Sequence, residues 1–105
     1  MSEYIVICES LKRAHLMFCH FVHTVAPRDN FRADYRNLKV RDVCGDTLRF
    51  VSNQDIFTKH ILQGFRGTEL SEREVESVIV DCFCNDRPIR RLAAIPNLIK
   101  EKEDH

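Results

Sequence analysis

Apolar residues near the start of the chain form a short unbroken run and then a helical repeat. Residues 4–8 (Tyr-Ile-Val-Ile-Cys) are apolar and rich in β-branched side chains, which predicts a strand that is covered on both faces. Ser10 is a suitable N-cap, and apolar residues recur at helical spacing from Leu11 to Val25. The pattern therefore predicts a mostly buried helix, which ends at Pro27.

The following segment predicts a short helix and then a β-hairpin. Asp29 or Asn30 is expected to cap the helix, which carries Phe31 and Tyr35 on one side. Two alternating stretches follow, residues 38–43 and 47–52, joined by Cys-Gly-Asp. Alternation around a short glycine-containing turn is typical of a hairpin.

Capping patterns divide the second half of the chain. Ser52 with Asp55 forms a capping-box pattern, which predicts a helix over residues 56–61. Gly64 and Gly67 then bracket a loop that contains Phe65 and Arg66.

The last part of the chain predicts one more helical turn and one more strand. Ser71 with Glu74 forms a second capping pattern, here for a short turn, and residues 78–83 form another apolar run typical of a covered strand. The predicted fold is a single α/β domain over residues 1–98, with a small mixed sheet, a hairpin and helices packed on it. Residues 99–105 are expected to be a frayed polar tail.

The charge balance changes this picture by dividing the chain into two parts. Over 105 residues, 16 basic side chains oppose 16 acidic ones, which argues against a general polybasic coat for nucleic acid or membranes. Residues 11–50, however, hold eight basic residues against four acidic ones, and residues 51–86 hold three against seven. The asymmetry indicates two differently charged surfaces, unless both are simply solvated faces.

The cysteines and the apolar runs of the sequence bear on the compartment in which the protein is expected. The five cysteines are odd in number and two lie in apolar runs, which favours reduced thiols. No apolar run approaches the length of a membrane span, and no basic-then-apolar signal pattern is present. We expect a cytoplasmic protein with no cofactor and no membrane partner.

Arginines interleaved with aromatic residues are the main candidate for a binding surface. Such a pattern offers phosphate contacts beside rings on which bases can stack. Lys39, Arg41 and Arg49 lie on the predicted hairpin, where side chains on one face could extend the surface. The alternative is that the rings are core anchors and the arginines pair with nearby aspartates. The predicted contacts to nucleic acid or a partner are Arg28, Arg32, Tyr35, Arg36, Lys39, Arg41, Arg66, Arg87, Arg90 and Arg91.

A zinc site is the sharpest chemical alternative. Cys19 and His23 are four residues apart on the first predicted helix, and Cys82 and Cys84 are two apart at the end of the last predicted strand. Four such ligands could form a tetrahedral site. The same residues are also explained as core thiols and a half-buried histidine.

Three further segments follow one another in an order that resembles a known family. Residues 45–52 resemble a hairpin, residues 62–67 resemble an Arg-Gly loop, and residues 78–81 are similar to a magnesium-binding strand, all from the ATPase core of phage large terminases and related P-loop NTPases. The resemblance covers residues 38–83 and implies a truncated, degenerate P-loop-NTPase-like fold.

The departures from that family decide the expected function. The first predicted strand is followed by Cys8-Glu9-Ser10, which has no glycine and places a negative charge where phosphates would lie. Cys82 also follows Asp81 where the family has a catalytic glutamate. ATP hydrolysis is therefore not expected.

The predicted function is that of a small non-enzymatic binding module, phage- or mobile-element-derived, which contacts nucleic acid through arginines. The first alternative is a protein–protein inhibitor or adaptor, which would lay its acidic half, residues 51–86, on a basic partner. The second alternative is a zinc-stabilised regulatory domain. An open edge strand would also allow a homodimer.

Overall fold

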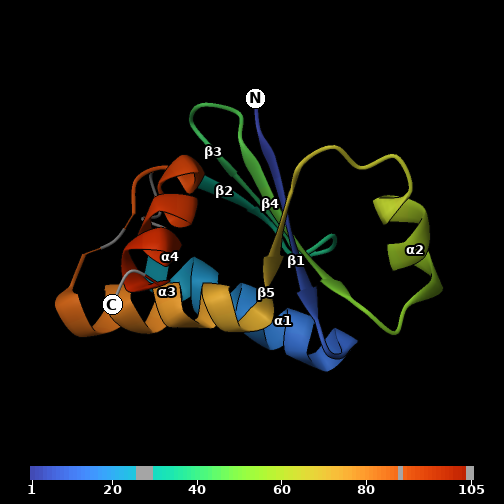
Figure 1. Ribbon diagram of the computed structural model, residues 1–105, viewed down its shortest axis with the longest axis horizontal. Helices are drawn as coiled ribbons and strands as arrows, with labels where there is room; N and C mark the ends of the chain where they lie inside the picture. Colours follow the sequence, from blue (N-terminus) through green and yellow to red (C-terminus); the bar gives the residue numbers. More distant parts are fainter. Residues whose placement is uncertain (26–29, 88, 104–105) are drawn as a thin grey trace.

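Five strands form one mixed sheet at the centre of the computed structural model, which describes residues 1–25, 30–87 and 89–103 (Figure 1). The strands lie in the order β2-β3-β4-β1-β5. β1 is parallel to β4 and β5, whereas β2, β3 and β4 pair antiparallel. A mixed sheet with helices packed on it confirms the predicted α/β class. The strands are β1 (Glu3–Cys8), β2 (Phe31–Asp34), β3 (Lys39–Asp42), β4 (Thr47–Ser52) and β5 (Thr68–Ser71).

β1 is covered on both faces, as its unbroken apolar run predicts. Val6 and Cys8 are fully buried on the face that carries the main core, and Ile5 is only 1% exposed on the opposite face. Side chains alternate along a strand, so a central strand buried on both sides needs no polar face.

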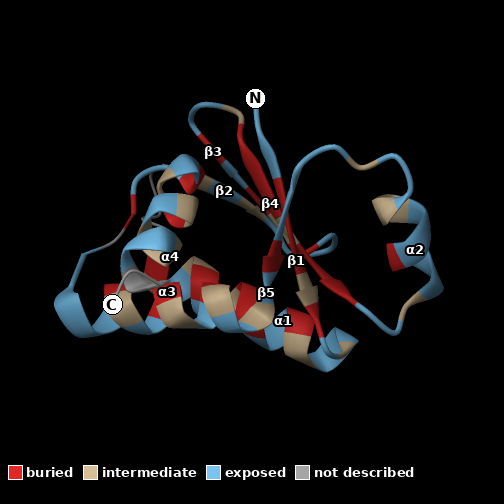
Figure 2. Ribbon diagram, in the orientation of Figure 1, coloured by how far each residue is buried: buried red, intermediate tan, exposed pale blue. Residues whose placement is uncertain are grey.

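Three helices and a π-helical turn form the main core against one face of the sheet, where Figure 2 shows buried residues concentrated. Phe18 and Phe21 pack their rings against Phe50 of β4, with ring centroids 6.1 and 6.0 Å away. Ser10 caps the first helix as predicted, its hydroxyl accepting from the Arg13 N–H. The elements are α1 (Leu11–His20), the π-helical turn η1 (Phe21–Val25), α3 (Glu72–Asn85), the 3₁₀ turn η2 (Leu92–Ala94) and α4 (Ile95–Glu103).

α2 (Ile56–Leu62) lies apart from the other helices, in the crossover from β4 to β5 (Figure 1). Its N-cap is Asp55, which accepts a hydrogen bond from the Phe57 N–H at 2.9 Å, and not Ser52 as the capping-box pattern predicts. Ile61 and the loop after α2 line a cavity on the second face of the sheet, opposite the main core. The crossover therefore partly covers that second face.

The segment predicted as a short helix after Asn30 is strand β2. Phe31 and Ala33 pack against the core, and the intervening side chains point away from it. The cap at Asp29 or Asn30, with Phe31 and Tyr35 on one side, predicted a helix, but residues four apart also share a face of a strand. Pairing with β3 decides between the two. The predicted helix end at Pro27 lies outside the described residues.

The predicted strand over residues 78–83 is part of helix α3, so that prediction is wrong. Ser71 does cap a helix, by accepting from the Glu74 N–H at 3.2 Å, but this helix continues to Asn85 instead of ending after one turn. Asp81 therefore lies within a helix and not at a strand end. The spacing that buries the apolar stripe is helical, with Val75, Val78, Ile79 and Cys82 facing the core.

Two further segments differ from the predictions. Residues 68–71, for which no strand is predicted, form β5 and pair in parallel with β1. Residues 99–103, expected to belong to a frayed tail, continue helix α4 to Glu103.

Candidate functional site

Strand pairing gathers four basic side chains on the second face of the sheet. Arg32 of β2 lies directly opposite Arg41 of β3, and Lys39 of β3 lies opposite Arg49 of β4. Directly paired residues share a face, and alternation turns this set away from Val40, which is in the main core. Three adjacent strands thus present cations to the same side.

Within the described ranges, these cations share their face with the carboxylates Asp34 and Glu3 but form no ion pair with either. In the described part of the chain, the ion pairs within 4.0 Å involve only Arg13, so none of the four sheet cations has one. Asp34 lies opposite Lys39, and its pKa is lowered mainly by hydrogen bonds from Asn37, with a smaller contribution from Lys39. The surface therefore retains positive charge that an external anion can use.

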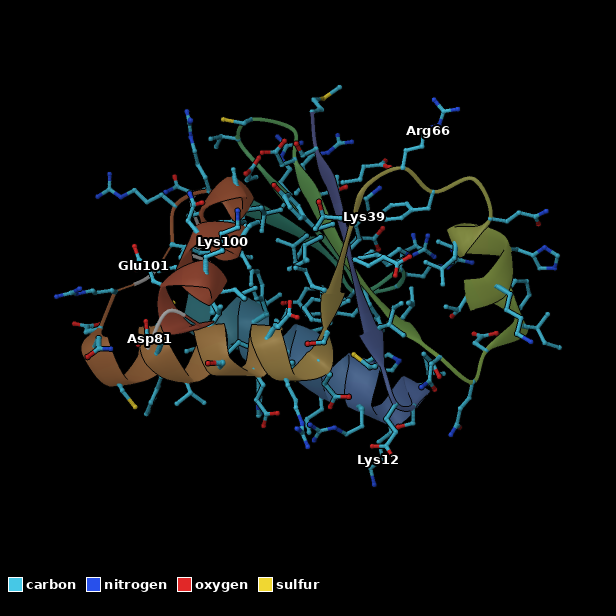
Figure 3. All side chains as sticks on the ribbon, viewed as in Figure 1. Lys12, Lys39, Arg66, Asp81, Lys100 and Glu101 are labelled. Carbon is cyan, nitrogen blue, oxygen red and sulfur yellow. The ribbon has the colours of Figure 1, made fainter. Side chains whose placement is uncertain are left out.

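A groove lies between these strands and the loop that follows α2. A cavity of about 310 Å³ is lined by Lys39 and Arg49 from the sheet and by Phe65 from the loop. An adjoining cavity of about 480 Å³ is lined by Lys39, Arg41 and the loop residue Arg66. Figure 3 shows Arg66 extending outward from this loop and Lys39 over the sheet. We call the two cavities together the sheet-face groove, lined by Glu3, Lys39, Arg41, Thr47, Arg49, Phe65 and Arg66.

Arg49, one of the residues that line this groove, carries an unsatisfied donor. Its Nε atom is buried and has no hydrogen-bond partner in the described part of the chain. An unpaired buried donor of a charged group is costly, because the group has lost water without gaining an acceptor.

The structure divides the predicted contact residues into two groups. Arg32, Lys39, Arg41 and Arg66 lie on or beside the sheet-face groove. The other described members line neither of its cavities: Tyr35, Arg36, Arg87, Arg90 and Arg91. Arg28 lies outside the described residues.

Tyr35 and Phe31 are not stacking partners for the sheet cations. Tyr35 is exposed, but its ring packs edge-on against Phe18, with centroids 5.3 Å apart, and Phe31 packs against the core. The ring that does line the groove is Phe65. The sequence predicts only that Phe65 lies in a loop, since nothing local indicates that this loop approaches the hairpin.

The predicted zinc ligands are not assembled. Cys82 is buried and Cys84 is exposed, because two residues apart on helix α3 they point in different directions. Over the described ranges, no three side chains of His, Cys, Asp or Glu are placed to hold a metal ion. The grouping of Cys19 and His23 with these two cysteines is therefore a wrong prediction.

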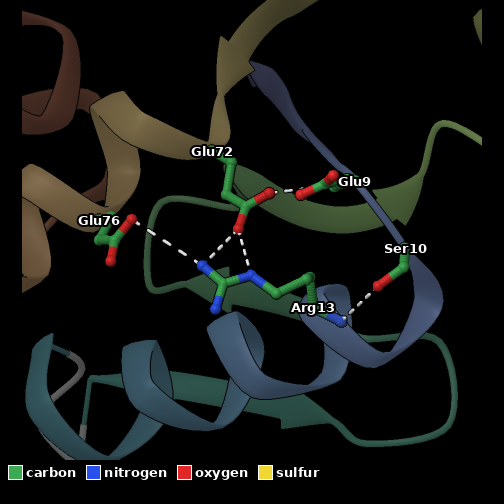
Figure 4. A network of polar contacts seen from close by, with 5 residues as sticks. All are labelled: Glu9, Ser10, Arg13, Glu72 and Glu76. Atoms are coloured by element: carbon green, nitrogen blue, oxygen red, sulfur yellow. Dashed lines mark hydrogen bonds and ion pairs between the residues drawn. The ribbon is translucent and has the colours of Figure 1, made fainter.

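The turn after β1, where the resembling family binds phosphate, is tied to an acidic side chain (Figure 4). Glu72 of α3 accepts hydrogen bonds from the Glu9 backbone N–H at 3.1 Å and from Arg13 Nε at 2.5 Å. Burial, with the Glu72 charge nearby, raises the pKa of the Cys8 thiol to about 12. A carboxylate at this position repels phosphate, so this turn is not suited to binding an anion.

No helix in the described ranges is both long enough and apolar enough to cross a membrane. Comparison with protein-family models, with curated proteins and with solved structures found no match for the chain. The site is therefore interpreted from its own geometry.

Proposed function

We propose that this protein is a non-enzymatic binding module that holds nucleic acid on the second face of its sheet. The observation that carries the proposal is the strand register, which lines up Arg32, Lys39, Arg41 and Arg49 on that face. Their charges are not taken up by ion pairs within the described chain. A row of free cations is what a polyphosphate backbone requires, because each contact releases condensed counterions.

The composition of the groove supports binding in preference to catalysis. Its charged side chains are Lys39, Arg41, Arg49 and Arg66, together with one carboxylate, Glu3. Such a set attracts and positions anions, whereas acid–base hydrolysis requires a paired acid and base near the reacting bond. We expect the ligand to be held and released unchanged.

The acidic half is a weaker candidate for an interaction surface. Among its side chains, Glu72 already bonds Arg13 of α1, and Asp55 caps α2. Carboxylates engaged inside the fold are less available to a basic partner. Nucleic-acid binding by the groove is therefore favoured over the inhibitor or adaptor function.

The test compares two double charge reversals that change net charge equally. Arg41→Glu with Arg66→Glu removes two exposed cations of the groove, and Arg87→Glu with Arg90→Glu removes two exposed cations outside it. Fluorescence anisotropy with labelled single-stranded and duplex oligonucleotides measures affinity at about 50 mM salt. We expect the groove variant to lose roughly tenfold or more in affinity and the control to lose much less.

Thermal unfolding of both variants checks that the fold is retained, since exposed charges contribute little to stability. No binding by the unaltered protein at low salt would refute the proposal. Equal losses in the two variants would refute the assignment of the groove.

A further inference from the structure

The two walls of the sheet-face groove differ in chemistry. In the smaller cavity the strands contribute the cations Lys39 and Arg49, whereas the crossover contributes Gln63 and the apolar side chains Ile61 and Phe65. A groove that needed only to bind phosphates would not require an aromatic wall. A charged wall facing a ring is the arrangement that holds an unpaired nucleotide, with its phosphate on one side and its base on the other.

The Phe65 ring is fixed in the groove by its loop. The Phe65 N–H donates to the Leu62 carbonyl at 3.1 Å, which closes the turn after α2. The tip of the ring lies so close to Gly67 that a Cβ at Gly67 would collide with it and with the Glu3 carbonyl. Phe65 is half-buried, so its ring is partly supported by protein and partly open to the cavity. A ring held in this way stacks a base with little loss of side-chain entropy.

Arg49 adds a second cation, beside Lys39, to the same cavity. Its Nε is buried and has no partner in the described chain, and its side chain lines the cavity together with Phe65. The positive charge of its guanidinium group favours a phosphate in this cavity. The cavity, at about 310 Å³, is at the lower end of the range for small-ligand sites, which suits one or two nucleotide units.

We infer that the groove is selective for single-stranded nucleic acid and that Phe65 stacks an unpaired base; this rests on the proposed function. In a duplex the bases are already stacked and paired, so Phe65 would find no free base and only the phosphate contacts would remain. The adjoining cavity, with Arg41 and Arg66, holds the neighbouring phosphates of the strand.

The chain contains no tryptophan, so a single introduced tryptophan reports on the groove directly. In Phe65→Trp, an oligothymidine of about 12 nucleotides should quench the indole fluorescence on binding, because the base stacks on it. Phe83→Trp, at an exposed aromatic position of α3, is the matched control and should not be quenched. A duplex of the same length should quench neither variant.

Affinity gives the second readout. Phe65→Leu keeps an apolar side chain beside Gly67 but removes the ring, and it should weaken oligothymidine binding roughly 5- to 100-fold. Phe65→Tyr should restore binding, and Phe83→Leu should have no effect.

The outcomes separate this inference from the proposed function. If duplex and single strand bind equally and Phe65→Leu changes neither affinity, the inference fails while the proposed function stands. If the unaltered protein binds no oligonucleotide, both fail. Loss of single-strand binding in Phe65→Leu, with duplex binding unchanged, supports both.

Discussion

Replacing Asp42 with alanine should remove the polar anchor that joins the β3–β4 hairpin to the helical side of the molecule. Asp42 is 4% exposed. Its Oδ1 accepts hydrogen bonds from the backbone N–H groups of Cys44 at 2.9 Å and Asp46 at 3.0 Å. Its Oδ2 accepts from the Leu92 N–H at 3.0 Å, across 50 residues of sequence. One carboxylate thus holds both the hairpin turn and the segment that precedes α4.

The expected loss of unfolding free energy depends on which N–H donors lose their acceptor. The bonds from Asp46 and Leu92 are buried, and a buried donor left unsatisfied costs about 1–3 kcal/mol. Asp42→Ala should therefore lower the free energy of unfolding by about 3–5 kcal/mol, a large part of the stability of a small domain. Urea denaturation followed by circular dichroism measures the change.

Asp34→Ala is the matched control, because Asp34 also accepts two backbone N–H bonds in a hairpin turn, from Arg36 and Asn37, but in solvent. It should lose less than about 1 kcal/mol, since water can replace the lost acceptor. Similar losses for the two variants, or a loss below about 1 kcal/mol for Asp42→Ala, would refute the reasoning.

Two other substitutions test the packing around the groove and the buried thiol. Gly67→Ala should destabilise the fold and weaken oligonucleotide binding, because a Cβ would collide with the Glu3 carbonyl and the Phe65 ring. An unchanged melting temperature would contradict the close approach of Gly67 to the Glu3 backbone. The pKa of the Cys8 thiol is raised from 9.0 to about 12, so folding favours the neutral thiol. The contribution of this group to stability is complete below about pH 9 and is lost as the pH rises toward 12. Urea denaturation above pH 9 should show stability falling by up to about 1.4 kcal/mol per pH unit from this group, and Cys8→Ser should show a flatter fall; parallel pH profiles would exclude the effect.

The sequence predicted a helix or strand correctly where all residues near it in the chain indicated the same element. The run over residues 4–8 predicted a covered strand, and Ser10 soon after it marked the start of α1. The hairpin followed from alternation on both sides of Gly45, whose φ of 85° suits a glycine in a turn. Both elements formed as predicted because their signals lie within about ten residues of each other.

Where the prediction failed, the deciding contacts are distant in sequence. Residues 78–83 are apolar enough for either a strand or a helix, and packing of α3 against η1 and α4 selects the helix. β2 and β5 each have four residues, and each exists because a partner strand supplies hydrogen bonds. Four residues are too few for a periodic pattern to distinguish strand from helix.

The site was partly predictable for the same reason. Lys39, Arg41 and Arg49 could be expected on one face, because hairpin register follows from alternation. The approach of Phe65 and Arg66 depends on the β4–α2–β5 crossover, which brings their loop over the second face. No local pattern indicates the path of this crossover, so the position of Phe65 in the groove could not be predicted from the sequence.

The salt dependence of oligonucleotide binding is the sharpest test of whether the groove holds nucleic acid. Five cations lie on or beside the groove: Arg32, Lys39, Arg41, Arg49 and Arg66. If all five contact phosphates of a single strand, the logarithm of the affinity should fall with the logarithm of salt with a slope of about −3.5, and Arg41→Glu with Arg66→Glu should reduce that slope by about 1.4. A slope near zero, or a slope that this double variant leaves unchanged, would contradict the account.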